Sequence, residues 1–181
     1  NIQKKITINY QGDNFILDKT RIAHWERFVP YKENHEFFLN YFYINKITNG
    51  SDSLSKRIRF FSLHQNLKNI LKKYPNYNIV ECGCWNGCST YIIAKLLQKN
   101  NFNKNFYIFD SFEGLSNFSK EDLNEHIQKQ PMADSYKSDE GVFLQNFKKF
   151  NFIDIKKGWI PDRFVEVKNK KFSFINIDVD L

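Results

Sequence analysis

The chain of 181 residues lacks a long apolar run, and it lacks the pattern of a secretory leader at its start. A membrane-spanning helix needs roughly 20 consecutive apolar residues, and the longest apolar stretches here are far shorter. A leader would place an apolar segment behind basic residues at the N-terminus. We therefore expect a cytoplasmic protein with no membrane partner.

Cysteine is scarce, and the three residues present, Cys82, Cys84 and Cys88, lie in one short segment. A zinc site would need a fourth ligand and usually a C-x-x-C pair, which this spacing does not provide. A disulfide is disfavoured because Cys82 and Cys84 alternate along one predicted strand. We interpret all three as small, reduced core residues, which suits a cytoplasmic protein.

A long basic run is also missing, although the net charge is +7. The lysines stand singly or in pairs among Asn, Phe and Tyr residues. A basic balance without a recognition motif is weak support for nucleic-acid binding, so we expect no nucleic-acid partner. An acidic or phosphorylated sugar could use the same positive field.

What the sequence does contain is a strand, a glycine turn, a helix and a second strand in close succession. Residues 78–89 read as a buried strand that runs into a glycine turn, and residues 89–98 carry helix-like apolar spacing. Residues 106–109 read as another strand, which ends on Asp110. This succession is the first unit of a nucleotide-binding α/β fold.

The glycine turn lacks the middle glycine of a dinucleotide-binding loop. That glycine lets the backbone approach a pyrophosphate, but here bulky Trp85 takes its place between Gly83 and Gly87. Glu81, just before the turn, would also repel a diphosphate. The turn therefore disfavours NAD. It favours a ligand with an adenosine ribose, a cationic end and no phosphate, such as S-adenosylmethionine.

Four segments resemble successive motifs of one enzyme family, the macrocin-type O-methyltransferases, which methylate sugar hydroxyls of macrolides and other natural products. They are residues 81–87 (ECGCWNG), 109–115 (FDSFEGL), 157–161 (KGWIP) and 177–181 (IDVDL). Their order and spacing are those of the family, and the resemblance covers residues 77–181. Val179 departs from it, since the family usually has glycine between the two aspartates.

The resemblance implies an α/β fold: the Rossmann-like sheet of class I methyltransferases, with strand order 3-2-1-4 and an N-terminal helical extension. In the family, two more helices and three more strands follow, so we expect a C-terminally incomplete fold with the later strands missing. We expect residues 1–75 to form an N-terminal arm and a helical cap or dimerisation region. Residues 76–181 would form the S-adenosylmethionine-binding domain.

Apolar periodicity and turn signals predict the remaining elements. We expect a hairpin or extended arm within residues 1–23, and helices over residues 25–47 and 54–74. Residues 116–139 read as a lid or binding loop because of their length. The further elements are a helix from Ser138 or Asp139 to Phe150, strands over residues 152–157 and 172–177, and a short helix after Pro161.

The apolar faces of the predicted helices lead to further expectations. The helix over residues 54–74 carries one broad stripe of Ile58, Phe61, Leu63, Leu67, Ile70 and Leu71. The helix ending at Phe150 carries Val142, Phe143, Phe147 and Phe150. The aromatic cluster of the first helix consists of Phe37, Phe38, Tyr41, Phe42 and Tyr43. This aromatic cluster covers too much of its helix to face one small core, so we expect part of it to meet a substrate lid or a partner subunit of a homo-oligomer.

Each motif falls at the carboxyl end of a predicted parallel strand, where open α/β sheets bind ligands. The residues expected to bind S-adenosylmethionine are Glu81, Cys82, Gly83, Cys84, Gly87, Ser89, Asp110, Ser111, Gly158 and Trp159. Glu81 and the turn would hold the methionine end, by its ammonium and its carboxylate respectively. Asp110 would accept both ribose hydroxyls, or alternatively serve as a helix cap or turn residue. Ser111 and Trp159 would flank the adenine, with core packing as the alternative for Trp159.

Asp178 and Asp180 would form the chemical end of the site. A sugar hydroxyl is a poor nucleophile at neutral pH, so a base or a metal must assist it. The resemblance implies that Asp178 is the catalytic residue and first Mg²⁺ ligand and that Asp180 supports the metal site, with further ligands beyond Leu181. Carboxylate oxygens suit Mg²⁺. Among the histidines, we place His126 alone near a substrate.

The expected function is S-adenosylmethionine-dependent methyl transfer to a hydroxyl of a small molecule, such as a sugar or a related metabolite. The alternative is a catalytically inactive binding or interaction protein with a nucleotide-binding fold. Trp85 disfavours a third reading, an NAD-dependent oxidoreductase. The strand over residues 172–177 would leave one apolar edge bare. We therefore expect a longer chain or a partner to cover that edge, and we expect the 181 residues alone to be inactive.

Overall fold

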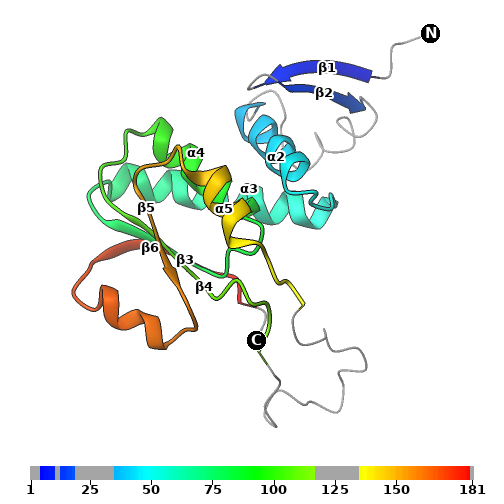
Figure 1. Cartoon of the computed structure of the whole chain (residues 1–181). Helices are drawn as coiled ribbons and strands as arrows, with labels where there is room; N and C mark the ends of the chain where they lie inside the picture. The colour runs from blue at the N-terminus through cyan, green and yellow to red at the C-terminus, as the bar shows by residue number, and fades with distance from the viewer. Residues whose placement is uncertain (1–4, 11–12, 19–34, 117–134, 180–181) are drawn as a thin grey trace, which may run out of the picture.

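The computed structural model describes residues 5–10, 13–18, 35–116 and 135–179. Its centre is a four-stranded parallel sheet with the order β5-β4-β3-β6 (Figure 1). The strands are β3 (Asn78–Cys82), β4 (Phe106–Asp110), β5 (Ile153–Lys157) and β6 (Phe172–Ile177). This order, with β3 as the first strand of the sheet, confirms the expected 3-2-1-4 arrangement.

Helices cover the two faces of the sheet unequally. The helices are α2 (His35–Ile47), α3 (Leu54–Lys73), α4 (Cys88–Lys99), α5 (Glu140–Phe147) and the short 3-10 helix η1 (Asp162–Val167). The α-helices gather on one face and η1, in orange, lies on the other (Figure 1). Side chains alternate between the two faces of a strand. Ile79 therefore packs in the larger hydrophobic cluster, which includes residues of the α-helices, and Val80 packs in the smaller one, which includes Val167 of η1.

An antiparallel hairpin, β1 (Lys5–Tyr10) and β2 (Asp13–Asp18), precedes the helices and confirms the hairpin alternative. The first part of the expected helix over residues 25–47 and most of the predicted loop lie outside the described residues. No helix in the described part of the chain is long and apolar enough to cross a membrane.

The aromatic cluster of α2 packs on the core of this chain, so it does not exceed what one core can cover, and a contact of its partly buried members with a lid or a partner subunit stays a prediction. Phe37, Phe38 and Tyr41 are fully buried, and Phe42 and Tyr43 pack against the same core. The rings meet α3 and α4: Phe37 contacts Phe61 edge-on and Tyr43 contacts Tyr91. Because α2, α3 and α4 form one layer, a helix apolar on most of its surface finds enough cover within the monomer.

The buried face of α3 differs from the predicted stripe. Ser53 caps the helix, accepting a hydrogen bond from the Lys56 N–H at 3.2 Å. Phe60, Leu67 and Leu71 are buried together with Arg57, whereas Ile58 is 39% exposed. Arg57 tolerates burial because its guanidinium forms a two-point ion pair with Asp52.

The expectation for the helix before β5 was wrong in detail. Asp139 caps α5, accepting from the Val142 N–H at 2.9 Å, but α5 ends at Phe147 and Val142 faces solvent. The strand β6 pairs with β3 alone among the described residues, and Ile177 on it is 68% exposed. The bare edge agrees with the expected strand order, and the side chains of β6 are only partly buried.

Candidate functional site

A cavity of about 450 Å³ opens at the carboxyl ends of the four strands. Its volume lies in the range of small-molecule sites. Of the residues predicted to bind a ligand, it is lined by Gly83, Cys84, Ser89, Asp110, Ser111, Gly158, Trp159 and Asp178. Glu81, Cys82 and Gly87 are not among its lining residues. Asp180 and His126 lie outside the described residues.

The turn between β3 and α4 needs its two glycines because other parts of the protein approach them. Gly83 has φ +81°, and a Cβ there would lie 2.3 Å from the backbone oxygen of Asp178. Gly87 has φ +84°, and a Cβ there would lie 2.5 Å from the ring of Phe147. The glycine spacing thus reflects the protein's own packing at this turn.

Asp110, at the end of β4, holds the turn in place. Its Oδ2 accepts from the backbone N–H of Cys84 at 2.6 Å and of Trp85 at 3.0 Å. Its Oδ1 accepts from the N–H of Phe112 at 2.7 Å. Asp110 therefore does serve as a turn residue, the alternative to the ribose role. A carboxylate offers about four acceptor positions, so Asp110, which also lines the pocket, keeps capacity for a ligand hydroxyl.

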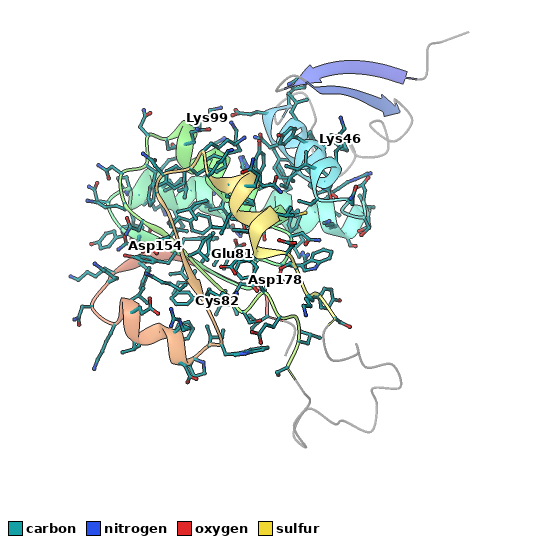
Figure 2. The ribbon with its side chains drawn as sticks, in the orientation of Figure 1. Lys46, Glu81, Cys82, Lys99, Asp154 and Asp178 are labelled. Atoms are coloured by element: carbon teal, nitrogen blue, oxygen red, sulfur yellow. The ribbon has the colours of Figure 1, made fainter. Side chains whose placement is uncertain are left out.

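Glu81 lies in the interior rather than at the pocket (Figure 2). Its carboxyl accepts from the Thr90 hydroxyl of α4 at 2.5 Å and from the Asn176 amide of β6 at 3.0 Å. Burial raises the pKa of this carboxyl from 4.5 to about 7; Asp178 adds to the rise and the hydrogen bonds oppose it. Glu81 therefore links β3, α4 and β6, and because it does not line the cavity, its contact with a ligand ammonium stays a prediction.

The three cysteines are free and buried, as expected. Cys84 and Cys88 line the cavity, and Cys82 lies behind it. Burial raises the pKa of the Cys84 thiol well above its ordinary value, and the carboxylate of Asp110 adds to this effect. Both causes keep the thiol protonated, so Cys84 contributes a small neutral wall to the pocket.

Trp159 follows β5 and is 43% exposed at the pocket wall. This exposure excludes core packing as its main role. Ser111, on the neighbouring strand end, also lines the pocket, and its hydroxyl accepts from the Glu113 N–H at 3.1 Å. The two residues bound one side of the cavity, with the flat indole available for stacking.

Two aromatic residues that line the pocket were not predicted from the sequence as site residues. Trp85 and Tyr136 pack edge to face with ring centroids 5.7 Å apart, and both line the cavity. Both hold positive φ angles, +44° and +64°, which bulky residues rarely adopt. Tyr136 lies in the segment predicted as a lid or binding loop, so its place at the pocket agrees with that expectation.

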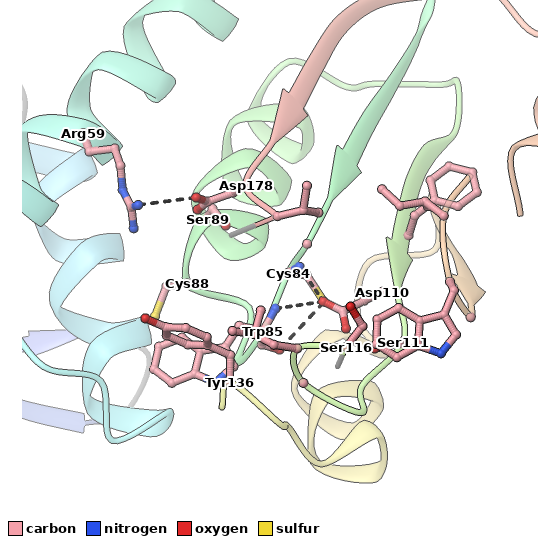
Figure 3. A pocket seen from close by; sticks show the side chains of 18 of the residues that line it. Arg59, Cys84, Trp85, Cys88, Ser89, Asp110, Ser111, Ser116, Tyr136 and Asp178 are labelled. Carbon is pink, nitrogen blue, oxygen red and sulfur yellow. Dashed lines mark hydrogen bonds and ion pairs between the residues drawn. The ribbon is translucent and has the colours of Figure 1, made fainter. Parts of the chain in front are cut away.

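Cations from α3 also line the pocket, and no sequence signal indicated them. Arg59 forms an ion pair with Asp178, with 3.4 Å between Nη1 and Oδ1 (Figure 3). Lys56, one turn earlier, donates to Asn45 Oδ1 at 2.8 Å and to the Ser51 carbonyl at 2.9 Å. The apolar spacing of α3 predicts a helix that packs on a core, and it does not predict that α3 lies beside β6.

The described residues do not by themselves fit Mg²⁺ at Asp178. No group of three Asp, Glu, His or Cys side chains that could hold a metal occurs in the described part of the chain. The carboxylate of Asp178 faces a guanidinium, whereas Mg²⁺ requires several oxygen ligands. The donor set around Asp178 is therefore that of an ion pair.

Comparison with known proteins identifies the relationship of this chain. Two solved structures share its fold, the O-methyltransferase NovP and the calicheamicin methyltransferase CalS11. Both are 17% identical to it, with TM-scores of 0.50 and 0.51. The matches cover 68% and 82% of this chain, but 54% of NovP and 68% of CalS11. The chain thus spans about half the length of NovP.

At this level of identity the structural likeness shows the fold alone. A search of curated protein sequences gave no match. The profile of the macrocin-O-methyltransferase (TylF) family matches residues 50–181, which is most of the chain. The chain therefore belongs to the macrocin-O-methyltransferase family.

Proposed function

We propose that this protein uses S-adenosylmethionine to methylate a hydroxyl of a small molecule, of the sugar or related natural-product class. The observation that carries the proposal is the row of groups along the carboxyl edge of the sheet. An indole (Trp159), a carboxylate (Asp110), a glycine turn and a second carboxylate (Asp178) succeed one another around one cavity. These groups match, in that order, an adenine, a ribose, the methionine part with its sulfonium, and an acceptor hydroxyl beside the methyl group.

In this arrangement Trp159 and Ser111 flank the adenine, and Asp110 accepts a ribose hydroxyl with its remaining acceptor capacity. Gly83, Cys84 and Ser89 line the path of the methionine part. Cys82, Gly87 and Glu81 support the turn from behind. The bulk of Trp85 between the glycines continues to disfavour a dinucleotide.

The reaction is an in-line displacement at the sulfonium methyl group. The acceptor oxygen forms a bond to the methyl carbon while the bond from that carbon to sulfur breaks and its electron pair stays on sulfur. The hydroxyl proton must leave, and we propose the carboxylate of Asp178 as the general base that takes it before it passes to solvent. The products are the methyl ether and S-adenosylhomocysteine.

The resemblance also implies Mg²⁺ held by Asp178 and Asp180, which would stabilise the negative charge that develops on the acceptor oxygen. The described residues alone do not fit this ion. The metal requirement stays a prediction: turnover should stop in excess chelator and return when Mg²⁺ is added. Turnover that is unaffected by the chelator would refute it.

The division of the chain remains a proposal as well. We propose that residues 1–75 act as a cap, since Lys56 and Arg59 of α3 line the pocket. Residues 76–181 would then be the cofactor-binding domain.

A homo-oligomer remains a prediction that the burial of the aromatic cluster does not support. The alternative function, an inactive binding protein, would bind the cofactor without turnover.

Replacement of Asp110 by Ala tests the cofactor site. We expect the affinity for S-adenosylhomocysteine to fall at least tenfold, because a lost hydrogen bond to a charged group contributes about 1.5–3 kcal/mol and because three backbone N–H groups of the turn lose their acceptor. Isothermal titration calorimetry measures the change, with NAD as a ligand that should not bind.

Asp139→Ala is the matched control. It removes an aspartate that also accepts a backbone N–H, at the start of α5, but that does not line the cavity. Its affinity for S-adenosylhomocysteine should equal that of the wild type. Equal affinity in the Asp110 variant would rule out the cofactor site proposed here.

A further inference from the structure

Arg59 reaches the pocket from α3, outside the sheet that carries the other site residues. Its side chain is 59% exposed, and its guanidinium lies over the ring of Phe60 at 5.2 Å. Within the described residues its one hydrogen bond goes to Asp178, through Nη1. A guanidinium has five N–H donors in a planar fork. Arg59 is therefore held in place by two contacts while most of its donors remain available on the pocket side.

The order of the strands puts Arg59 at the end of the pocket opposite Trp159. Trp159 follows β5, Asp110 ends β4, the glycine turn follows β3 and Asp178 follows β6. Neighbouring strands lie about 4.8 Å apart, so the row from β5 to β6 spans about 14 Å. Figure 3 shows Arg59 beside Asp178, across the pocket from Ser111. An extended nucleoside with its base at Trp159 would place its far end near Arg59.

The charged residues along the strand ends from β5 to β6 limit the positions at which a ligand carboxylate can bind. The carboxylate of Asp110 lines the pocket and would repel it, whereas the charge of Asp178 is paired with Arg59. In the described part of the lining, the cations are Lys56 and Arg59. Lys56 already donates to Asn45 and Ser51. The N-terminus of α4, at Cys88 and Ser89, adds a favourable dipole at the same end.

We infer that Arg59 binds the α-carboxylate of the methionine part of the cofactor, with its guanidinium oriented by Asp178 and Phe60. This inference rests on the proposed function and adds to it a binding residue from the helical cap. The cap is then part of the cofactor site, because α3 supplies the cation that binds the carboxylate of the methionine part. The ion pair with Asp178 is long and half exposed, so a ligand carboxylate can share the guanidinium without breaking a buried contact.

Two nucleosides separate the role of Arg59 from the rest of the site. S-adenosylhomocysteine carries the amino-acid carboxylate, and 5′-methylthioadenosine has the same base, ribose and sulfur without it. In Arg59→Gln we expect the affinity for S-adenosylhomocysteine, measured by calorimetry, to fall at least tenfold. The affinity for 5′-methylthioadenosine should stay within twofold of the wild type, which also reports that the variant is folded. Arg59→Lys keeps the charge but loses the fork, so its affinity should lie between those of the wild type and Arg59→Gln.

Lys72→Gln is the matched control, since it removes one positive charge from an exposed position of the same helix away from the pocket. Its affinity for both nucleosides should equal that of the wild type. The inference fails if Arg59→Gln binds S-adenosylhomocysteine as the wild type does, or if it loses affinity for both nucleosides equally. If the wild type binds neither nucleoside, the proposed function fails together with the inference.

Discussion

Replacing Glu81 with Gln should make the protein more stable at pH 8 and leave its stability at pH 5 nearly unchanged. In the folded protein burial raises the pKa of Glu81 from 4.5 to about 7, so the carboxyl keeps its proton up to that pH. The unfolded chain releases the proton near 4.5. Between these values the folded state binds more protons, so stability falls as the pH rises and is lowest above pH 7.

The size of this effect follows from the two pKa values. A rise from 4.5 to about 7 corresponds to on the order of 3 kcal/mol of lost stability at pH 8. Gln resembles the protonated carboxyl: its oxygen can accept from Asn176, and its amide can donate to the hydroxyl of Thr90. The variant should therefore lack the loss that the wild type suffers between pH 5 and pH 8.

Urea unfolding of both proteins at pH 5, 6, 7 and 8 measures this difference. Other groups titrate equally in the two proteins, so the difference between their unfolding free energies isolates Glu81. Glu113→Gln, at an exposed position, is the control and should follow the wild type at every pH. If the curves of the wild type and of Glu81→Gln run parallel, Glu81 is ionised throughout this range.

Gly83→Ala should destabilise the protein by about 3 kcal/mol and abolish cofactor binding. Gly83 has φ +81°, a conformation that costs a residue with a Cβ about 1–2 kcal/mol. The new methyl group would also lie 2.3 Å from the backbone oxygen of Asp178, and overpacking costs about 1–3 kcal/mol. The Asp178 N–H donates to the Cys82 carbonyl at 2.9 Å, so relief of the clash would separate the ends of β3 and β6.

Chemical unfolding and calorimetry with S-adenosylhomocysteine check both parts of this prediction. Gly141→Ala is the matched control, because Gly141 lies within α5 and, among the described residues, its Cβ would meet only the side chain of Asp139, at 3.2 Å. There Ala should change stability by less than about 1 kcal/mol, since it favours the helix. Wild-type stability of the Gly83→Ala protein would mean that the backbone of Asp178 does not lie against Gly83.

The sequence alone determined the elements of this protein and their order in the sheet. β3, β4 and β5 were predicted within a residue or two because short apolar runs bounded by turn residues carry a local signal. The resemblance supplied the strand order, and it also located the residues at the strand ends. Gly83, Asp110, Ser111, Trp159 and Asp178 line one cavity because the carboxyl ends of parallel strands meet at one edge of the sheet.

The tertiary structure decided which side chains face which neighbours. α3 is apolar on several sides, so its period did not reveal that Phe60 is buried and Ile58 exposed. Glu81 sits beside the glycine turn in the sequence, yet its side chain points into the interior towards Thr90 and Asn176.

Arg59 and Asp178 are 119 positions apart, and they meet because α3 packs beside β6. A local pattern specifies the conformation of its own segment. The orientation of a side chain depends on distant segments, whose contacts form only when the whole chain has folded.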